Sequence, residues 1–517
     1  MPDRLTPLDA SFLYLESTET PMHVGSVMVF AGIGRARRPV DHVRLVKHVE
    51  ARIAFVPRYR QRLRTVPGRL ANPVWVDDEN FDIDHHVRQS ALPAPGTLDQ
   101  LAGLVAELQA RPLARDRPLW ELTLVEGLED GRFAVVTKVH QALVDGVHAV
   151  DLGQVVLDTS PDSYDPPAQT WTPAPEPTLV ELVVGAVSDS VRSPQQVVET
   201  LRSGIGSVRS SAGSAFEVLG ELAARTAARP TQRSPLNQEV GADRRFCMVS
   251  TDLEDYREIR DFTAVRRRRT AGRVRAGTPR DTVVTAATGG RVFGPVPDPS
   301  AVPAPAPESQ AASVTDVVLA TLAGGLRAWL LTRGEPIRPS SMVRALVPFS
   351  IHPDGTDPEG APAGAIGSDL AWLLVDLPTG EQSPLMRLHQ VAYQTRAHRE
   401  GGRGVEARAL AGIAGFAPPT LHSLGARAAS GLSRRLFNVV VTNVPGPQLP
   451  LYLRRARMLA SYPVIPLARG QALSVGLTSY DGGVYYGLYA DRAAMPDLAV
   501  LGQCVVDSLA EMIEAVR

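Results

Sequence analysis

The feature that most constrains this fold is a buried strand that ends in polar residues. Residues 133–139 are apolar and largely β-branched, and they follow a turn-forming Asp130-Gly131 pair. This pattern predicts an interior strand. His140 and Gln141 stand at its end, and residues 147–158 beyond them have a helical pattern. The chain is therefore predicted to pass from a strand through a short polar loop into a helix.

The polar loop matches all but one position of an acyl-transfer motif, His-His-x-x-x-Asp-Gly. His140, Asp145 and Gly146 fit the pattern, and Gln141 stands where the second histidine belongs. A hydroxyl that attacks a thioester must lose its proton, and an imidazole is well suited to accept it near neutral pH. A glutamine amide can orient a substrate but cannot take that proton. Because a positioned base contributes ~10²–10⁴ in rate and substrate proximity can contribute as much, the sequence predicts weakened acyl transfer.

His140 is not expected to replace the missing base. Successive side chains of a strand point to opposite faces, so His140 and Gln141 should diverge if the strand geometry continues through them. Asp145 is also a suitable N-cap for the helix that follows. An alternative interpretation, that Asp145 is only a cap and His140 only a structural residue, stays open at this point.

Several further short sequence blocks occur along the chain, each of them once. They have the sequences Pro-Leu-Asp-Ala-Ser-Phe-Leu, Pro-Met-His-Val-Gly, Arg-Pro-Leu-Trp-Glu, Asn-Val-Pro-Gly-Pro, Tyr-Pro-Val and Ser-Tyr-Asp-Gly, at residues 7–13, 21–25, 117–121, 443–447, 462–464 and 479–482. In this order the chain resembles the bacterial wax ester synthase/acyl-CoA:diacylglycerol acyltransferase family over nearly its whole length.

The resemblance implies a fold and a set of roles. The fold class would be α/β, with two related lobes of the CoA-dependent acyltransferase type joined by a helical crossover and the motif at a shared tunnel. His140 would be structural or accessory, and Gln141 occupies the position of the family's general base. Asp145, followed by Gly146, would hold the loop in shape, usually through an arginine. Acyl-CoA would be a co-substrate, and neither a permanently bound cofactor nor a metal is expected.

Two other family positions differ here. Thr315-Asp316 stands where the family has an Asn-Asp pair, and Gly367-Ser368 where it has a Gly-Asn pair. These changes are consistent either with a different acceptor substrate or with a fold that has lost its catalytic activity. The expected function is transfer of a fatty acyl group from acyl-CoA to diacylglycerol or a long-chain alcohol, which yields triacylglycerol or wax ester. The alternative is a catalytically inactive acyl-CoA- or lipid-binding protein on the same fold. A condensation enzyme fed by a carrier protein shares the motif but not the flanking blocks.

Composition divides the chain into three parts. Residues 1–160 are predicted to form the N-terminal lobe, 161–235 a Pro-rich connector with amphipathic crossover helices, and 236–517 the C-terminal lobe. The apolar stripe of the crossover helices could pack on the body or contact a membrane. Within the last part, residues 264–312 are rich in Arg, Pro and Ala and are predicted to be a disordered insertion. Its arginines could meet lipid headgroups or CoA phosphates, or only solvent.

The net charge of the 517 residues is −1, which argues against a nucleic-acid partner. Cys247 and Cys504 match no metal or redox spacing and suit a reducing compartment. No signal-peptide pattern begins the chain, so we expect a cytoplasmic protein. Residues 317–331 are apolar but short, and are predicted to be a buried helix. Membrane or lipid-droplet contact, if any, should be peripheral.

Overall fold

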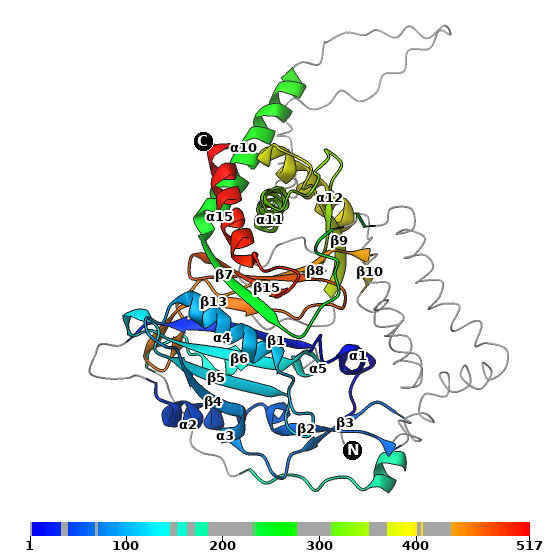
Figure 1. Ribbon diagram of the computed structural model, residues 1–517, viewed down its shortest axis with the longest axis vertical. Helices are drawn as coiled ribbons and strands as arrows, with labels where there is room; N and C mark the ends of the chain where they lie inside the picture. The colour runs from blue at the N-terminus through cyan, green and yellow to red at the C-terminus, as the bar shows by residue number, and fades with distance from the viewer. Residues whose placement is uncertain are drawn as a thin grey trace, which may run out of the picture.

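The computed structural model shows two α/β lobes, each built on a twisted sheet with helices packed against it (Figure 1). The structure describes residues 3–32, 40–67, 71–144, 152–162, 171–184, 231–232, 234–276, 312–350, 370–400, 405–406 and 436–517.

The N-terminal lobe contains a six-stranded sheet in the order β12-β13-β1-β6-β5-β4. Its strands are β1 (His23–Phe30), β4 (Val87–Ala91), β5 (Trp120–Glu126), β6 (Phe133–His140), β12 (Tyr452–Leu453) and β13 (Ala456–Val464). Every residue of β6 is buried, as its apolar, β-branched sequence predicts. The motif begins at the last residue of this central strand, His140.

The helices of this lobe lie on both sides of the sheet. They are α1 (Pro7–Leu15), α2 (His42–Ile53), α3 (Ile83–His86), α4 (Leu98–Ala110), α5 (Gln141–Val144) and α6 (Leu152–Val156). Helix α4 begins at a capping box in which Thr97 and Gln100 exchange hydrogen bonds. It lies between this sheet and the C-terminal lobe, whereas α2 covers the opposite side (Figure 1).

The C-terminal lobe contains a seven-stranded sheet in the order β10-β9-β8-β11-β14-β15-β7. Its strands are β7 (Arg244–Asp252), β8 (Val343–Ser350), β9 (Leu370–Leu377), β10 (Val405–Glu406), β11 (Val439–Pro445), β14 (Leu473–Tyr480) and β15 (Gly483–Asp491). Its helices are α10 (Leu253–Ala276), α11 (Val314–Thr332), α12 (Pro384–Glu400) and α15 (Leu498–Glu514), and they lie on the side away from the N-terminal lobe (Figure 1).

Strand β13 ties the two lobes together. It belongs to the C-terminal half of the chain but pairs antiparallel with β1, with Ser26 opposite Pro463. On its other side Pro463 packs against Gly476 and Gly487 of β14 and β15, where any Cβ atom would collide with it. The division of the sequence at residue 236 therefore does not coincide with the division of the fold in space.

Helix α11 lies at the centre of the outer helical layer. Within the described part of the chain it is the one helix long and apolar enough to cross a bilayer, yet 72% of its apolar window is buried inside the protein. The prediction of a buried helix over residues 317–331 is therefore confirmed. A Ser313–Asp316 capping box begins it.

The Pro-rich connector is docked on the N-terminal lobe where the structure describes it. Glu176 forms ion pairs with Arg62 and Arg64, which belong to a two-stranded ribbon of β2 (Gln61–Arg64) and β3 (Val74–Asp77). Leu182 packs on Val74 and Val76 of the same ribbon. Thr178 and Glu181 exchange hydrogen bonds and form a capping box at the start of the next helical turn.

The predicted start of the disordered insertion is corrected by α10. This helix continues through Ala276, so residues 264–276 are helical. The physical reason is that Arg and Ala favour helix and that the first proline of the segment comes later, at Pro279. Residues 277–311 lie outside the described residues.

Candidate functional site

His140 is sealed into the protein at the end of β6. Its backbone N–H donates to the carbonyl of Leu119 at 2.9 Å, and the residue is 1% exposed. The ring Nδ1 accepts the backbone N–H of Ala142 at 3.0 Å, so the ring proton sits on Nε2. That Nε2 atom lies 3.6 Å from Oε1 of Glu16. Both ring nitrogens therefore face protein groups.

Gln141 occupies a different environment from its neighbour. It is partly exposed, and its backbone N–H donates to the carbonyl of Met22 at 2.9 Å. The helix α5 begins at Gln141 itself, so the predicted polar loop before a helix at 147 is corrected at its start. Pairing of β6 with β1 ends at the His23–His140 pair, which leaves the chain free to turn. Asp145, Gly146 and His148 lie outside the described residues.

Glu16 connects the first helix to the motif. It follows α1 as the C-cap residue, and its carboxylate is nearly buried. Oε1 accepts the Met22 N–H at 3.4 Å, and Oε2 pairs with the guanidinium of Arg115, whose Nε lies 3.2 Å away. Burial would raise the pKa of Glu16, but the nearby His140 ring and the hydrogen-bonded guanidinium of Arg115 outweigh burial and lower the pKa to about 2. Glu16 is therefore a carboxylate at neutral pH.

His23 lies beside this cluster without serving as a base. Its Nε2 is 3.5 Å from Oε1 of Glu16, and its ring meets that of His140 edge-on at 6.1 Å between centroids. Nδ1 donates to the carbonyl of Gln109 and Nε2 accepts the N–H of Leu113, both at 3.4 Å. Burial lowers the pKa of His23 to about 3, so its imidazole is neutral and structural.

The sequence did not predict the contact among Glu16, Arg115 and His140. Glu16 and His140 are 124 positions apart, and Arg115 follows Glu16 by 99. No spacing rule brings such residues together, because strand order in the sheet decides it. The available signal was that each lies in or near a short block of the family resemblance.

The two residues of the altered Thr315-Asp316 pair have different roles. Asp316 is buried, belongs to the capping box of α11, and accepts a hydrogen bond from the Thr395 hydroxyl at 2.7 Å. Thr315 instead accepts a hydrogen bond from the side-chain amide of Asn443 at 3.1 Å. Asp316 is thus structural, while Thr315 joins the Asn-Val-Pro-Gly-Pro block. Gly367 and Ser368 lie outside the described residues.

That block ends a strand rather than forming a turn throughout. The strand β11 continues through Pro445, so the first three residues of the block at 443–447 belong to the strand. Asn443 and Pro445 stay paired because β14 runs parallel beside them, with Asn443 opposite Leu477. The chain leaves the sheet at Gly446, where a Cβ atom would lie 2.4 Å from the carbonyl oxygen of Ser479.

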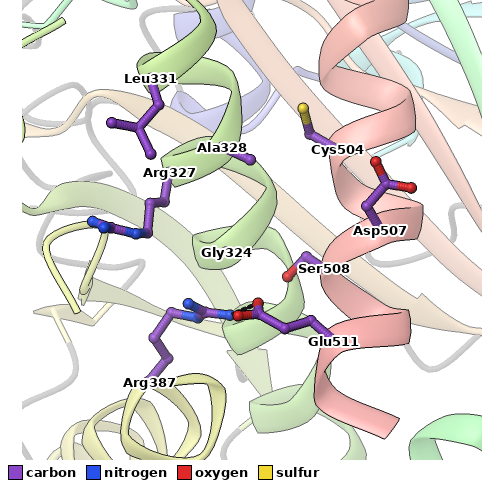
Figure 2. Close-up of a pocket in the computed structure, with 9 residues that line it drawn as sticks. All are labelled: Gly324, Arg327, Ala328, Leu331, Arg387, Cys504, Asp507, Ser508 and Glu511. Atoms are coloured by element: carbon purple, nitrogen blue, oxygen red, sulfur yellow. Dashed lines mark hydrogen bonds and ion pairs between the residues drawn. The ribbon is translucent and has the colours of Figure 1, made fainter. Parts of the chain in front are cut away.

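A separate pocket of about 330 Å³ lies between α11, α12 and α15. Figure 2 shows Arg387 reaching from α12 to Glu511 on α15, and Ser508 pointing toward Gly324 of α11. The Arg387 side chain is buried and already paired with Glu511. These helices belong to the outer layer of the C-terminal lobe, away from β6 (Figure 1), so the pocket is distinct from the motif site.

Metal and disulfide chemistry have no support in the part of the chain that the structure describes. It contains no group of three His, Cys, Asp or Glu side chains that could hold a metal ion. Cys247 and Cys504 are free thiols, and burial raises the pKa of both.

Comparisons with known proteins agree over both lobes. The model of the wax ester synthase/diacylglycerol acyltransferase catalytic domain matches residues 5–266, and the C-terminal domain model of that family matches 366–513. A probable diacylglycerol O-acyltransferase of Mycobacterium tuberculosis is 32% identical over 535 positions, which cover 99% of each chain. A second one is 42% identical over 263 residues, which are 50% of this chain and 96% of that relative.

Solved structures show the same two-lobed fold. The wax ester synthase/diacylglycerol acyltransferase from Marinobacter aquaeolei covers 99% of both chains, with a TM-score of 0.63 and 27% identity. The trichothecene 15-O-acetyltransferase from Fusarium sporotrichioides, at 10% identity, shares the fold alone, with a TM-score of 0.55 over 99% of this chain and 94% of that one. The predicted fold class is confirmed.

Proposed function

Because the chain belongs to the wax ester synthase/diacylglycerol acyltransferase family, we propose that it transfers a fatty acyl group from acyl-CoA to an alcohol. The acceptor is diacylglycerol or a long-chain alcohol, and the product is triacylglycerol or a wax ester. The observation that carries the proposal is the family match over both lobes, in a chain whose motif strand is followed directly by the partly exposed Gln141.

The chemistry requires the acceptor hydroxyl to attack the thioester carbonyl. A C–O ester bond forms as the C–S bond breaks, and the proton lost by the hydroxyl ends on the sulfur, so that coenzyme A leaves as the thiol. Gln141 orients the acceptor hydroxyl through its amide. His140 supports the backbone beside it by accepting the Ala142 N–H. From the motif alone, we also propose Asp145 and Gly146 as site residues. Burial of the acyl chain contributes ~0.8 kcal/mol per methylene to substrate binding.

The test is ester formation by the purified protein from labelled acyl-CoA with diacylglycerol or hexadecanol. We expect slow product formation that depends on acyl-CoA and falls in Asp145→Asn. The second candidate, an inactive acyl-CoA-binding protein, is favoured by the absence of a titratable side chain at Gln141. It would be established if acyl-CoA binds but neither the wild type nor Gln141→His forms ester.

We also propose peripheral contact with a lipid surface on the cytoplasmic side, either the inner membrane or a lipid droplet. The acceptors partition into such surfaces. Support comes from the short helix after Thr178, where Leu179, Val180 and Val184 are 56%, 71% and 59% exposed while Leu182 anchors it.

Serine at all three of these exposed positions is expected to lower flotation with diacylglycerol-containing vesicles several-fold. The matched control replaces Val500 and Val506 of α15, which are also exposed, by serine. Equal vesicle binding by the two variants and the wild type would refute the proposed surface.

A further inference from the structure

Glu16 is held in one place by the chain around it. It caps α1 by donating its backbone N–H to the Phe12 carbonyl at 3.1 Å. A tight turn follows, in which Ser17 and Thr20 exchange backbone hydrogen bonds of 3.3 and 3.2 Å and their hydroxyls meet at 2.8 Å. The turn brings the chain back so that Met22 and the start of β1 pass beside the carboxylate.

Two hydrogen bonds that hold the backbone at Gln141 lead to this carboxylate. The Gln141 N–H is bound by the Met22 carbonyl, and the N–H of the next residue, Ala142, is bound by the His140 ring. Met22 in turn donates its own N–H to Glu16, and the His140 Nε2–H points at the same oxygen from 3.6 Å. The backbone on either side of residue 141 is therefore fixed, each time through one intermediate residue, by Glu16.

We propose that Glu16 is a positioning residue of the acyl-transfer site, which sets the tautomer of His140 and the place of the residue 141 side chain. The inference rests on the proposed function, since it concerns the same site. The carboxylate lies 3.6 Å from Nε2 and favours the Nε2–H form of His140, the same form that leaves Nδ1 free to accept the Ala142 N–H. Arg115 completes the arrangement by neutralising a nearly buried charge.

Glu121 offers a matched control. It is a carboxylate of similar burial in the same lobe, 3.6 Å from Lys138 Nζ and 3.3 Å from a guanidinium nitrogen of Arg88. Loss of Glu121 removes an ion-paired carboxylate from the sheet without removing a partner of Met22 or His140.

Steady-state kinetics of Glu16→Ala, Glu16→Gln and Glu121→Ala test the proposal. We expect Glu16→Ala to lower kcat ~10², the cost typical of a small misplacement of a catalytic group, with KM for acyl-CoA unchanged. Glu16→Gln, which keeps an acceptor oxygen, should recover part of the loss, while Glu121→Ala should change kcat less than threefold. An equal loss in Glu16→Ala and Glu121→Ala, or a loss confined to KM, would overturn the proposal.

Nitrogen-15 spectra of histidine-labelled protein give a readout that needs no turnover. The His140 signals, assigned with His140→Asn, should report a single Nε2–H tautomer in the wild type and a mixture in Glu16→Ala. An unchanged tautomer would refute the positioning role even if acyl transfer is measured. A changed tautomer in a protein without acyl transfer would uphold the role of Glu16 and refute the proposed function.

Discussion

Replacing Gln141 by histidine is expected to raise kcat for acyl transfer ~10²-fold, since a positioned general base typically contributes ~10²–10⁴ in rate. The structure already fixes the backbone of residue 141 and leaves its side chain accessible, as a general base requires. Its backbone N–H is bound at 2.9 Å by the Met22 carbonyl, and its side chain is partly exposed while His140 behind it is sealed. A new imidazole would therefore stand at the place where we propose that the Gln141 amide orients the acceptor.

The measurement is kcat and KM for acyl-CoA with diacylglycerol, as a function of pH. Gln141→His should introduce a pH dependence near the ordinary histidine pKa of ~6.5, because the neutral imidazole is the active form. Gln141→Asn is the matched control, since it keeps an amide that cannot take a proton. If Asn raises kcat as much as His does, proton transfer is not what residue 141 limits. If His140→Ala abolishes a fast wild-type reaction, His140 is the base and the sealed-ring argument is wrong.

Alanine at Gly487 is expected to destabilise the protein by about 3 kcal/mol, the upper part of the range for forced overpacking. A Cβ atom there would lie 1.8 Å from the carbonyl oxygen of Pro463, which is backbone and cannot rotate away. Strands β15 and β13 would have to separate, and β13 is the strand by which the C-terminal half completes the sheet of the motif. Acyl transfer should fall with stability, because β1, the strand that pairs with β6, loses its outer neighbour.

Denaturant-induced unfolding of Gly487→Ala and the wild type measures this effect. Gly103→Ala is the control, since Gly103 lies on the exposed side of α4 with nothing near the position of a new Cβ atom. Alanine in a helix interior is favoured over glycine by ~0.5–1 kcal/mol, so that variant should be slightly more stable. A Gly487→Ala protein as stable as the wild type would show that the two lobes tolerate a wider separation at β13.

Local sequence was sufficient to predict several secondary-structure elements. The apolar run at 133–139, predicted to be an interior strand, forms β6. Buried α11 was predicted from its apolar pattern, and its capping box accounts for where it begins. These predictions hold because burial and capping depend on side chains within a few residues of one another.

Other features were missed because their causes are not local. The start of α5 at Gln141 depends on where β1 stops pairing with β6. Strand β13 alternates buried and more exposed residues in the usual way, and that alternation is the same whichever sheet it joins. The sequence of β13 therefore does not indicate that this strand pairs in the N-terminal sheet.

The sequence by itself determined the family, the two-lobed α/β class and the substitution of an amide for the motif base, because these follow from residue identities in order along the chain. Only the tertiary structure decided that His140 is sealed and that Glu16 and Arg115 stand behind it. It also decided that a C-terminal strand closes the motif's sheet. These features depend on contacts between residues 99 or more positions apart, which arise only when the strands are ordered and the lobes are packed.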